Sequence, residues 1–113
     1  MNLHQIIDRL DLKVLTEPQN FVSISPTGGY SSDLLSCVMA GAKKGQLWTT
    51  LQAHLNIVAV AALNEVAAII ITENAQPDEA TILKANQQGV ILLATALPTY
   101  SVNGLLWEMG IRS

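Results

Sequence analysis

The sequence predicts an α/β fold: a small single domain with a mainly parallel sheet and helices on both faces. From Gln46 onward, strand-like and helix-like segments alternate strictly, which is the order of a parallel sheet connected by helices. The strand-like segments 67–72 and 90–94 are almost entirely apolar, as in strands covered on both sides. The chain has 113 residues, 50% of them hydrophobic, enough for one core and too few for two ordinary domains. We therefore expect one domain over residues 1–113.

The N-terminal quarter of the chain predicts one helix and two short strands. Asn2 can cap a helix that ends near Leu10, because apolar residues recur there at helical spacing. A short strand over 13–16 follows, and the proline-containing segment 17–20 is predicted to be a turn. Apolar and polar residues then alternate over 21–25, which predicts a second short strand.

The glycine pair Gly28-Gly29 is predicted to form a turn between that strand and the next helix. Glycine adopts positive φ angles without steric cost, so alanine at either position should destabilise the fold if both have positive φ. Ser31 or Ser32 would cap the helix, and Asp33 would lie in its first turn. The same helix carries four apolar residues on one face, namely Leu34, Leu35, Val38 and Met39.

The remaining two-thirds of the chain predicts three strand–helix units. Gly45 and Gly89 end helices, and Pro77 suits the first turn of one, with acidic residues following it. The expected strands are 46–50, 67–72 and 90–94, and the expected helices are 57–65, 77–88 and 98–110.

Composition and charge argue against several classes of partner. The net charge is −3 and no basic run occurs, whereas binding to a phosphate backbone needs clustered Lys and Arg, so we expect no nucleic acid. The apolar stretch 55–71 is too short and too often interrupted to span a membrane. The lone Cys37 and the absence of a leader pattern predict a soluble, cytoplasmic protein. Charged residues make up only 13%, about half the usual ~25%, which indicates a surface partly covered by a partner.

The segment Thr27 to Ser32 is one candidate ligand site. Backbone N–H groups of a glycine loop at a helix start can approach an anion, and the hydroxyls of Thr27, Ser31 and Ser32 would add donors. No lysine follows, however, and the dinucleotide pattern Gly-x-Gly-x-x-Gly is absent. The alternative is an ordinary glycine turn followed by a serine cap.

Threonines at the ends of the predicted parallel strands form a second candidate. Thr49, Thr50, Thr72 and Thr95 fall at three carboxyl ends, the edge at which open α/β sheets bind ligands near a switch in strand order. Their hydroxyls could bind a small polar or phosphorylated molecule. The alternative is that threonine simply favours strands.

His54 is expected to hydrogen-bond a loop rather than to catalyse a reaction. The other nitrogen or sulfur ligands, His4 and Cys37, have no metal-binding spacing to it, so no metal or cofactor is predicted. No Gly-x-Ser-x-Gly elbow supports a catalytic triad. Trp48 and Trp107 are expected to pack in the core or at an interface.

Five segments together resemble a known family over the whole chain. They are residues 27–36 with 38–40, 45–61, 69–72, 77–78 and 89–90, in that order. This run is similar to the DRTGG domain. Its signature is here Thr27-Gly28-Gly29, preceded by Ser25-Pro26 where the family has Asp-Arg, so the obvious cation for an anionic ligand is missing.

The resemblance implies a regulatory or dimer-forming module. The DRTGG family is similar to the amino-terminal domain of HPr kinase/phosphorylase, an α/β unit that lacks the phosphate loop of the kinase. The domain also occurs between the CBS domains of regulated inorganic pyrophosphatases. The resemblance therefore implies a metabolic enzyme or a kinase as partner and no activity of the domain's own.

Three hypotheses of function follow. The leading one is a non-enzymatic regulatory or scaffolding module, and the second is a sensor of a nucleotide or similar anion that uses the glycine loop, His54 and the strand ends. The third is a small enzyme that uses His54 or Asp33. The segment 55–67 is apolar around nearly its whole circumference, and few elements of so small a domain are left to cover it, which predicts a homodimer through that helix.

Overall fold

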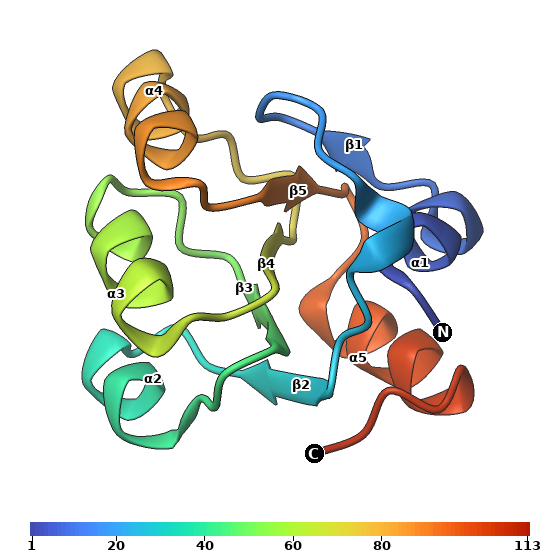
Figure 1. The fold of residues 1–113 in the computed structure, drawn as a ribbon. Helices are drawn as coiled ribbons and strands as arrows, with labels where there is room; N and C mark the ends of the chain where they lie inside the picture. The colour runs from blue at the N-terminus through green and yellow to red at the C-terminus, as the bar shows by residue number, and fades with distance from the viewer.

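A computed structural model describes all 113 residues and contains one five-stranded sheet. The strand order is β1-β5-β4-β3-β2; β2 to β5 are parallel, and β1 pairs antiparallel with β5 (Figure 1). This confirms the predicted fold class. The strands are β1 (Lys13–Val14), β2 (Gly28–Ser31), β3 (Gln46–Thr50), β4 (Ala68–Ile71) and β5 (Leu92–Ala94).

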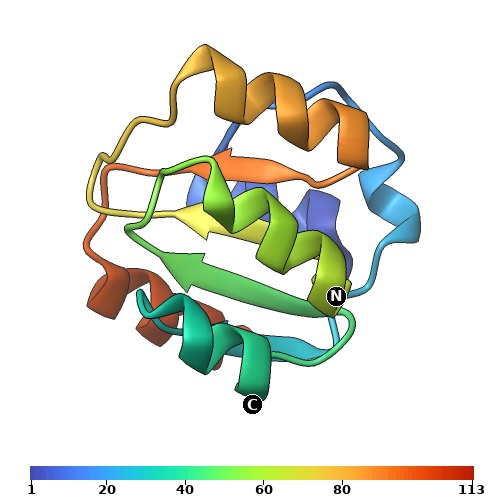
Figure 2. The same cartoon turned by 90° about the vertical axis from the view of Figure 1, so that its left-hand side faces the viewer.

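Helices cover both faces of the sheet in three layers. α2, α3 and α4 lie on one face, and α1 and α5 lie on the other (Figures 1 and 2). The central strands are buried on both sides because alternate side chains point into two separate cores. In β4, for example, Ile70 packs with the α1–α5 side and Ile69 with the α2–α4 side. The helices are α1 (Leu3–Leu10), α2 (Leu35–Gly41), α3 (Asn56–Asn64), α4 (Glu79–Gln88) and α5 (Thr99–Glu108).

Local sequence signals account for the ends of two helices. The Asn2 side chain accepts from the Gln5 backbone N–H, and the Gln5 side chain accepts from the Asn2 N–H, so α1 begins with a complete capping box. Asp78 caps α4 by accepting from the Thr81 N–H, and Gly89 ends it in the left-handed conformation. The start of α1 at the Asn2 cap and the end of α4 at Gly89 agree with the prediction, whereas α4 begins two residues later than predicted, so that Pro77 precedes its N-cap.

The predicted strand over 21–25 is wrong. Phe21–Ser23 form a short 3-10 helix (η1), in which the Ser23 hydroxyl donates to the Asn20 carbonyl. Phe21 and Ile24 both pack against the α1–α5 core instead of alternating between two faces. Local side-chain hydrogen bonds of this kind compete with strand pairing.

The predicted turn at Gly28-Gly29 is also wrong, because both glycines lie within β2. The glycines with positive φ are Gly45, Gly89 and Gly110, so positive φ does not explain the pair. The helix that follows begins later than predicted: its N-cap is Leu34, and Asp33 precedes it. None of the helices is both long and apolar enough to cross a membrane.

The surroundings of α3 differ from the expectation that few elements are left to cover it. α3 packs between α2 and α4, which contact its two sides (Figure 2). Four of its residues are buried, including Ile57 and Val58, whereas its outer stripe of Ala59 and Leu63 remains exposed. An apolar outer surface therefore remains, narrower than the sequence indicated.

Candidate functional site

The carboxyl ends of β3 and β4 are covered by α5 and by their own loops. Thr49 donates a hydrogen bond of 2.7 Å to Oδ1 of Asn103 in α5, and the Asn103 side-chain amide donates at 3.0 Å to Ser31 at the end of β2. Thr72 bonds to the Thr99 hydroxyl at the start of α5. Thr49 and Thr72 are 1% and 0% exposed, so their hydroxyls are taken up within the protein.

Asp33 holds the loop that follows β3. Its Oδ1 accepts from the Thr50 hydroxyl at 2.7 Å and from the Leu51 N–H at 2.9 Å. The Gln52 side chain donates back to the Asp33 carbonyl at 3.2 Å. These bonds tie the ends of β2 and β3 together and leave Asp33 in a structural role.

The proposed ligand segment 27–32 is divided between the two ends of β2. Thr27 precedes the strand; its N–H and hydroxyl donate to the carbonyls of Gly45 and Lys44 at the amino end of the sheet. Ser31 lies at the opposite end beside Thr49, and the Ser32 hydroxyl oxygen accepts from the Leu34 N–H. The loop that the sequence predicted therefore does not form one cradle.

Gly28 is explained by the C-terminal residues, which run along the outer edge of β2. The Gly29 N–H donates to the Arg112 carbonyl at 3.0 Å. A Cβ on Gly28 would lie 2.2 Å from that carbonyl oxygen, whereas a Cβ on Gly29 would have its nearest neighbours at 3.8 Å. Close backbone approach, and not turn geometry, is the reason for a glycine at position 28.

His54 lies in the loop before α3 and has no acid–base partner within hydrogen-bonding distance. It is exposed, and its Nδ1 accepts only from the Asn56 N–H at 3.5 Å. The hydrogen bonds that Thr81 donates to Asp78 lower the pKa of that carboxyl, and the electrostatic interaction with the nearby His54 lowers it further. No group of three His, Cys, Asp or Glu side chains is arranged to hold a metal ion.

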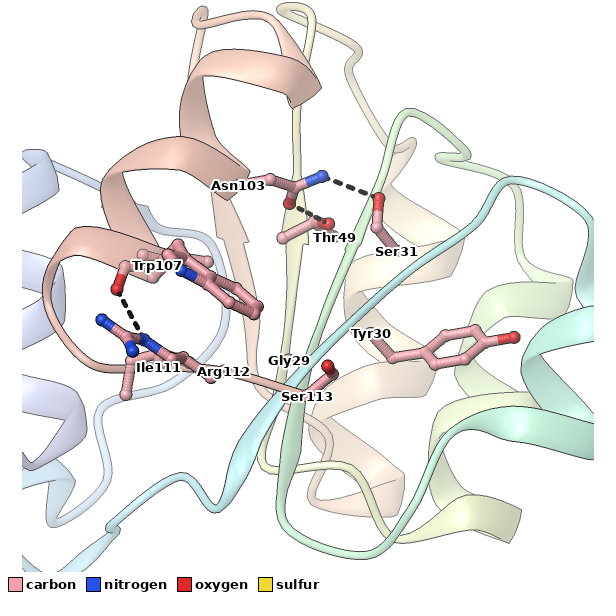
Figure 3. A pocket seen from close by; sticks show the side chains of 10 residues that line it. Gly29, Tyr30, Ser31, Thr49, Asn103, Trp107, Ile111, Arg112 and Ser113 are labelled. Atoms are coloured by element: carbon pink, nitrogen blue, oxygen red, sulfur yellow. Dashed lines mark hydrogen bonds between the residues drawn. The ribbon is translucent and has the colours of Figure 1, made fainter.

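A small pocket lies between β2, β3, α5 and the C-terminal residues. Its volume is about 100 Å³, and Figure 3 shows Ser31, Thr49 and Asn103 on one side and Trp107 and Arg112 on the other. The Arg112 guanidinium carbon is 5.1 Å from the centre of the Trp107 ring, and its Nε donates to the Trp107 carbonyl. The lining residues are Gly29, Tyr30, Ser31, Thr49, Asn103, Leu106, Trp107, Ile111, Arg112 and Ser113.

A larger, open pocket lies at the other flank of the sheet, beside β1 and β5. Its volume is about 500 Å³, and it includes Thr95 together with Lys13, Asn74 and Gln76. Thr95 accepts from the Leu97 N–H at 3.2 Å, which shapes the loop that forms one wall. The predicted threonines thus occupy three places: Thr49 at the small pocket, Thr95 at the large pocket, and Thr72 buried between them.

Sequence reasoning missed the three side chains that close the small pocket, namely Asn103, Trp107 and Arg112. Trp107, expected in the core or at an interface, is 52% exposed, whereas Trp48 is fully buried with its indole N–H donating to the Ser32 carbonyl. One signal was available: Asn103 shares a helical face with Leu106 and Trp107 at i+3 and i+4.

No family model and no curated protein matches this sequence. In three dimensions the chain is similar to a solved structure of the CBS and DRTGG domains of the regulatory region of Clostridium perfringens pyrophosphatase, complexed with the activator diadenosine tetraphosphate. The TM-score is 0.75 at 15% sequence identity, over 92% of this chain and 45% of that one. This chain thus spans less than half the length of its structural neighbour. The likeness establishes a fold of the DRTGG/CBS kind.

Proposed function

We propose that this chain is a regulatory module without catalytic activity of its own, acting in the cytoplasm on a metabolic enzyme or a kinase. The observation that carries the proposal is the hydrogen-bonded carboxyl edge of the sheet, where Asp33, Thr49 and Thr72 are bonded to protein groups and not poised toward a substrate. The similar solved structure is that of the regulatory region of a pyrophosphatase, which supports the same class of function.

Residues 1–113 would then form a single DRTGG-like domain. The signature Thr27-Gly28-Gly29 leads into β2, and the need for glycine at position 28 follows from the C-terminal residues that run along this strand. The finer relationship, to the amino-terminal domain of HPr kinase/phosphorylase, belongs to the same proposal and rests on the sequence resemblance.

An enzyme that uses His54 or Asp33 is disfavoured by the surroundings of both residues. Asp33 accepts two hydrogen bonds that fix a loop, and His54 has only a long bond to a backbone N–H. A general base needs a substrate proton within reach and a partner that sets its orientation. Turnover that His54→Ala abolished while the fold stayed intact would refute the non-enzymatic proposal.

A nucleotide or phosphometabolite is the second candidate, as a ligand of the larger pocket. Its volume of about 500 Å³ falls within the range of roughly 300–1,000 Å³ typical of ligand sites. Lys13 supplies a cation that no salt bridge within the protein occupies, and Asp11 places a carboxylate in the same lining. A thermal-shift screen of nucleotides and sugar phosphates tests this candidate, because a ligand that binds the folded state raises the melting temperature. No shift at millimolar concentration would remove it.

The module is proposed to act as a homodimer through the outer surface of α2 and α3. Neither helix contains a charged residue, and the large apolar side chains Leu34, Met39, Leu55 and Leu63 are exposed there. A twofold axis that packs this surface on its own copy would bury it twice. A stable interface of this kind buries on the order of 1,200–2,000 Å² in total.

Light scattering coupled to gel filtration tests the dimer. We expect the wild-type chain to elute with twice its monomer mass and Leu63→Glu to elute as a folded monomer, because a charge cannot be buried unpaired at an apolar contact. Leu83→Glu on α4 is the matched control, since Leu83 is 59% exposed against 68% for Leu63 but lies outside the surface. A wild-type chain that is monomeric at micromolar concentration would refute the dimer. A Leu63→Glu variant that remains dimeric would show that the interface does not include Leu63.

A further inference from the structure

The large pocket beside β1 and β5 lies where three loops from distant parts of the sequence meet. Residues 10–13 join α1 to β1, residues 74–76 follow β4, and residues 94–97 end β5 and lead toward α5. The Asn74 N–H donates to the Thr95 carbonyl at 3.1 Å, which ties the second loop to the third. The walls thus stand at the carboxyl ends of β4 and β5, on loops positioned by the sheet, where binding residues concentrate.

Two opposite charges in the lining of this pocket have no partner within the protein. Asp11 and Lys13 form no salt bridge with each other or with any further residue. The backbone of both is fixed: Asp11 is the left-handed C-cap of α1, with its N–H bonded to the carbonyls of Ile7 and Asp8. Lys13 pairs with Ala94 across β1 and β5. A ligand that meets both charges has to carry one cationic and one anionic group.

Two amides on the loop after β4 offer one free donor group and one free acceptor. The Gln76 Nε2 donates to the Asn74 carbonyl at 3.2 Å and to Asn74 Oδ1 at 3.4 Å. These bonds hold the amides side by side and leave Asn74 Nδ2 and Gln76 Oε1 without partners in the protein. The Thr95 hydroxyl accepts from the Leu97 N–H and keeps its own hydrogen to donate. The pocket therefore suits a group that both donates and accepts, as a primary amide does.

We propose that the large pocket binds an α-amino acid with an uncharged polar side chain. Lys13 would bind its carboxylate, and Asp11 would accept from its ammonium group. Its side chain would pass over Leu97 to reach the amides of Asn74 and Gln76. The volume of about 500 Å³ lies within the range of roughly 300–1,000 Å³ of small-molecule sites. This inference goes beyond the proposed function and rests on it only for what the ligand would regulate.

The balance of charge favours a zwitterion over a phosphate ester. The lining carries one cation and one carboxylate, so its formal charge is zero. A phosphate monoester has a charge of about −1.5 to −2 at pH 7. Lys13 would attract such a group, but Asp11 in the same lining would repel it. An amino acid presents the opposite charge to each of the two residues, so we expect it to bind more tightly than a nucleotide.

An NMR titration with L-glutamine tests the site directly. We expect millimolar glutamine to shift the side-chain amide resonances of Asn74 and Gln76. The side-chain amide of Asn64, which is bonded to carbonyls of α2, is the internal control and should not move. Two matched fragments dissect the charges: glutaramate lacks the ammonium group, and 4-aminobutanamide lacks the carboxylate. Each should bind about fivefold or more weakly than glutamine.

Two variants should affect these fragments in a crossed pattern. Asp11→Asn keeps the size of the side chain and tolerates the left-handed backbone, so it should weaken glutamine about fivefold without weakening glutaramate. Lys13→Gln should weaken glutamine and glutaramate and leave 4-aminobutanamide unchanged. The matched controls are Lys43→Gln and Glu108→Gln, which remove one exposed charge of each sign outside the pocket and should leave glutamine binding unchanged.

The outcomes separate this site from the wider proposal. No shift with glutamine in a folded, dimeric protein would refute the amino-acid pocket and leave the regulatory module standing. Tighter binding of adenosine monophosphate at the same resonances would refute it in favour of a nucleotide. Equal binding of either fragment, or the absence of the crossed pattern, would refute the roles of the two charges. Binding as expected in a protein that proves to be an enzyme would support the pocket and contradict the proposed function.

Discussion

Gly28→Ala and Gly29→Ala form a matched pair that tests why the glycines are there. The two residues are neighbours in β2, and neither has a positive φ. A methyl group on Gly28 would lie 2.2 Å from the Arg112 carbonyl oxygen, so the C-terminal residues would have to move by about 1 Å to restore an ordinary contact. A methyl group on Gly29 has its nearest neighbours at 3.8 Å and needs no displacement.

The displacement at position 28 has a cost that can be estimated. It breaks the hydrogen bond from Gly29 to Arg112, worth about 1 kcal/mol. It also loosens the neighbouring Ile111, which is 7% exposed and whose full burial is worth about 1.5–3 kcal/mol. Replacing glycine by alanine recovers about 0.4–1 kcal/mol through the unfolded state. We therefore expect Gly28→Ala to lower the free energy of unfolding by about 2 kcal/mol and Gly29→Ala to leave it unchanged or slightly raised.

Urea denaturation followed by circular dichroism measures both values, and the melting temperature of Gly28→Ala should fall by roughly 8 °C. Deleting Arg112 and Ser113 provides the control, because it removes the carbonyl that the methyl group meets. In the shortened chain Gly28→Ala should cost much less, as coupled sites are not additive. Equal stabilities of the two alanine variants, or an undiminished cost in the shortened chain, would refute this explanation.

Three other predictions concern single hydrogen-bonding groups. Asn64→Ala should lower the free energy of unfolding by about 1–2 kcal/mol, because its amide donates to three carbonyls at the end of α2, whereas Asn56→Ala should have little effect. Thr49→Val leaves Asn103 Oδ1 without its donor at a buried site and should cost about 1–3 kcal/mol in urea denaturation. Asp78, whose pKa is lowered in the fold, should stabilise α4 at neutral pH and lose that contribution as the pH falls through its lowered pKa; Asp78→Asn should flatten this acid limb of the melting temperature.

The parallel part of the sheet could be predicted because its signals are local. The apolar runs around Ile69–Ile71 and Leu92–Ala94 identify buried strands, and the caps at Asn2 and Gly89 place helix ends. Each of these signals lies within a few residues of what it determines. The boundaries of the last two strands were too wide by one or two residues at some ends, since apolar residues continue into the flanking loops.

The conformation of the Gly28-Gly29 pair and the hydrogen bonds between distant polar side chains could not be predicted in the same way. A Gly-Gly sequence is compatible with a turn and with a strand that another backbone approaches closely, and here the approaching residue, Arg112, is 84 positions from Gly28 in the sequence. Thr49 and Asn103 are 54 positions apart, so neither sequence neighbourhood contains the bond between them. The sequence therefore placed the threonines at the strand ends but gave no sign of the residues that bond to them, and their role in binding a ligand stays a prediction.

The strand order explains where ligands can reach this sheet. The strands β2, β3, β4 and β5 lie side by side in sequence order, so no reversal opens a crevice between two of them, contrary to the expectation from strand-end threonines. After β5 the chain crosses to the other face as α5, whose Thr99 and Asn103 bond to Thr72 and Thr49. This helix occupies the middle of the polar edge, and the two pockets remain at its flanks, beside β2 and beside β5. A ligand of either pocket would therefore contact one outer strand and the segment packed against it.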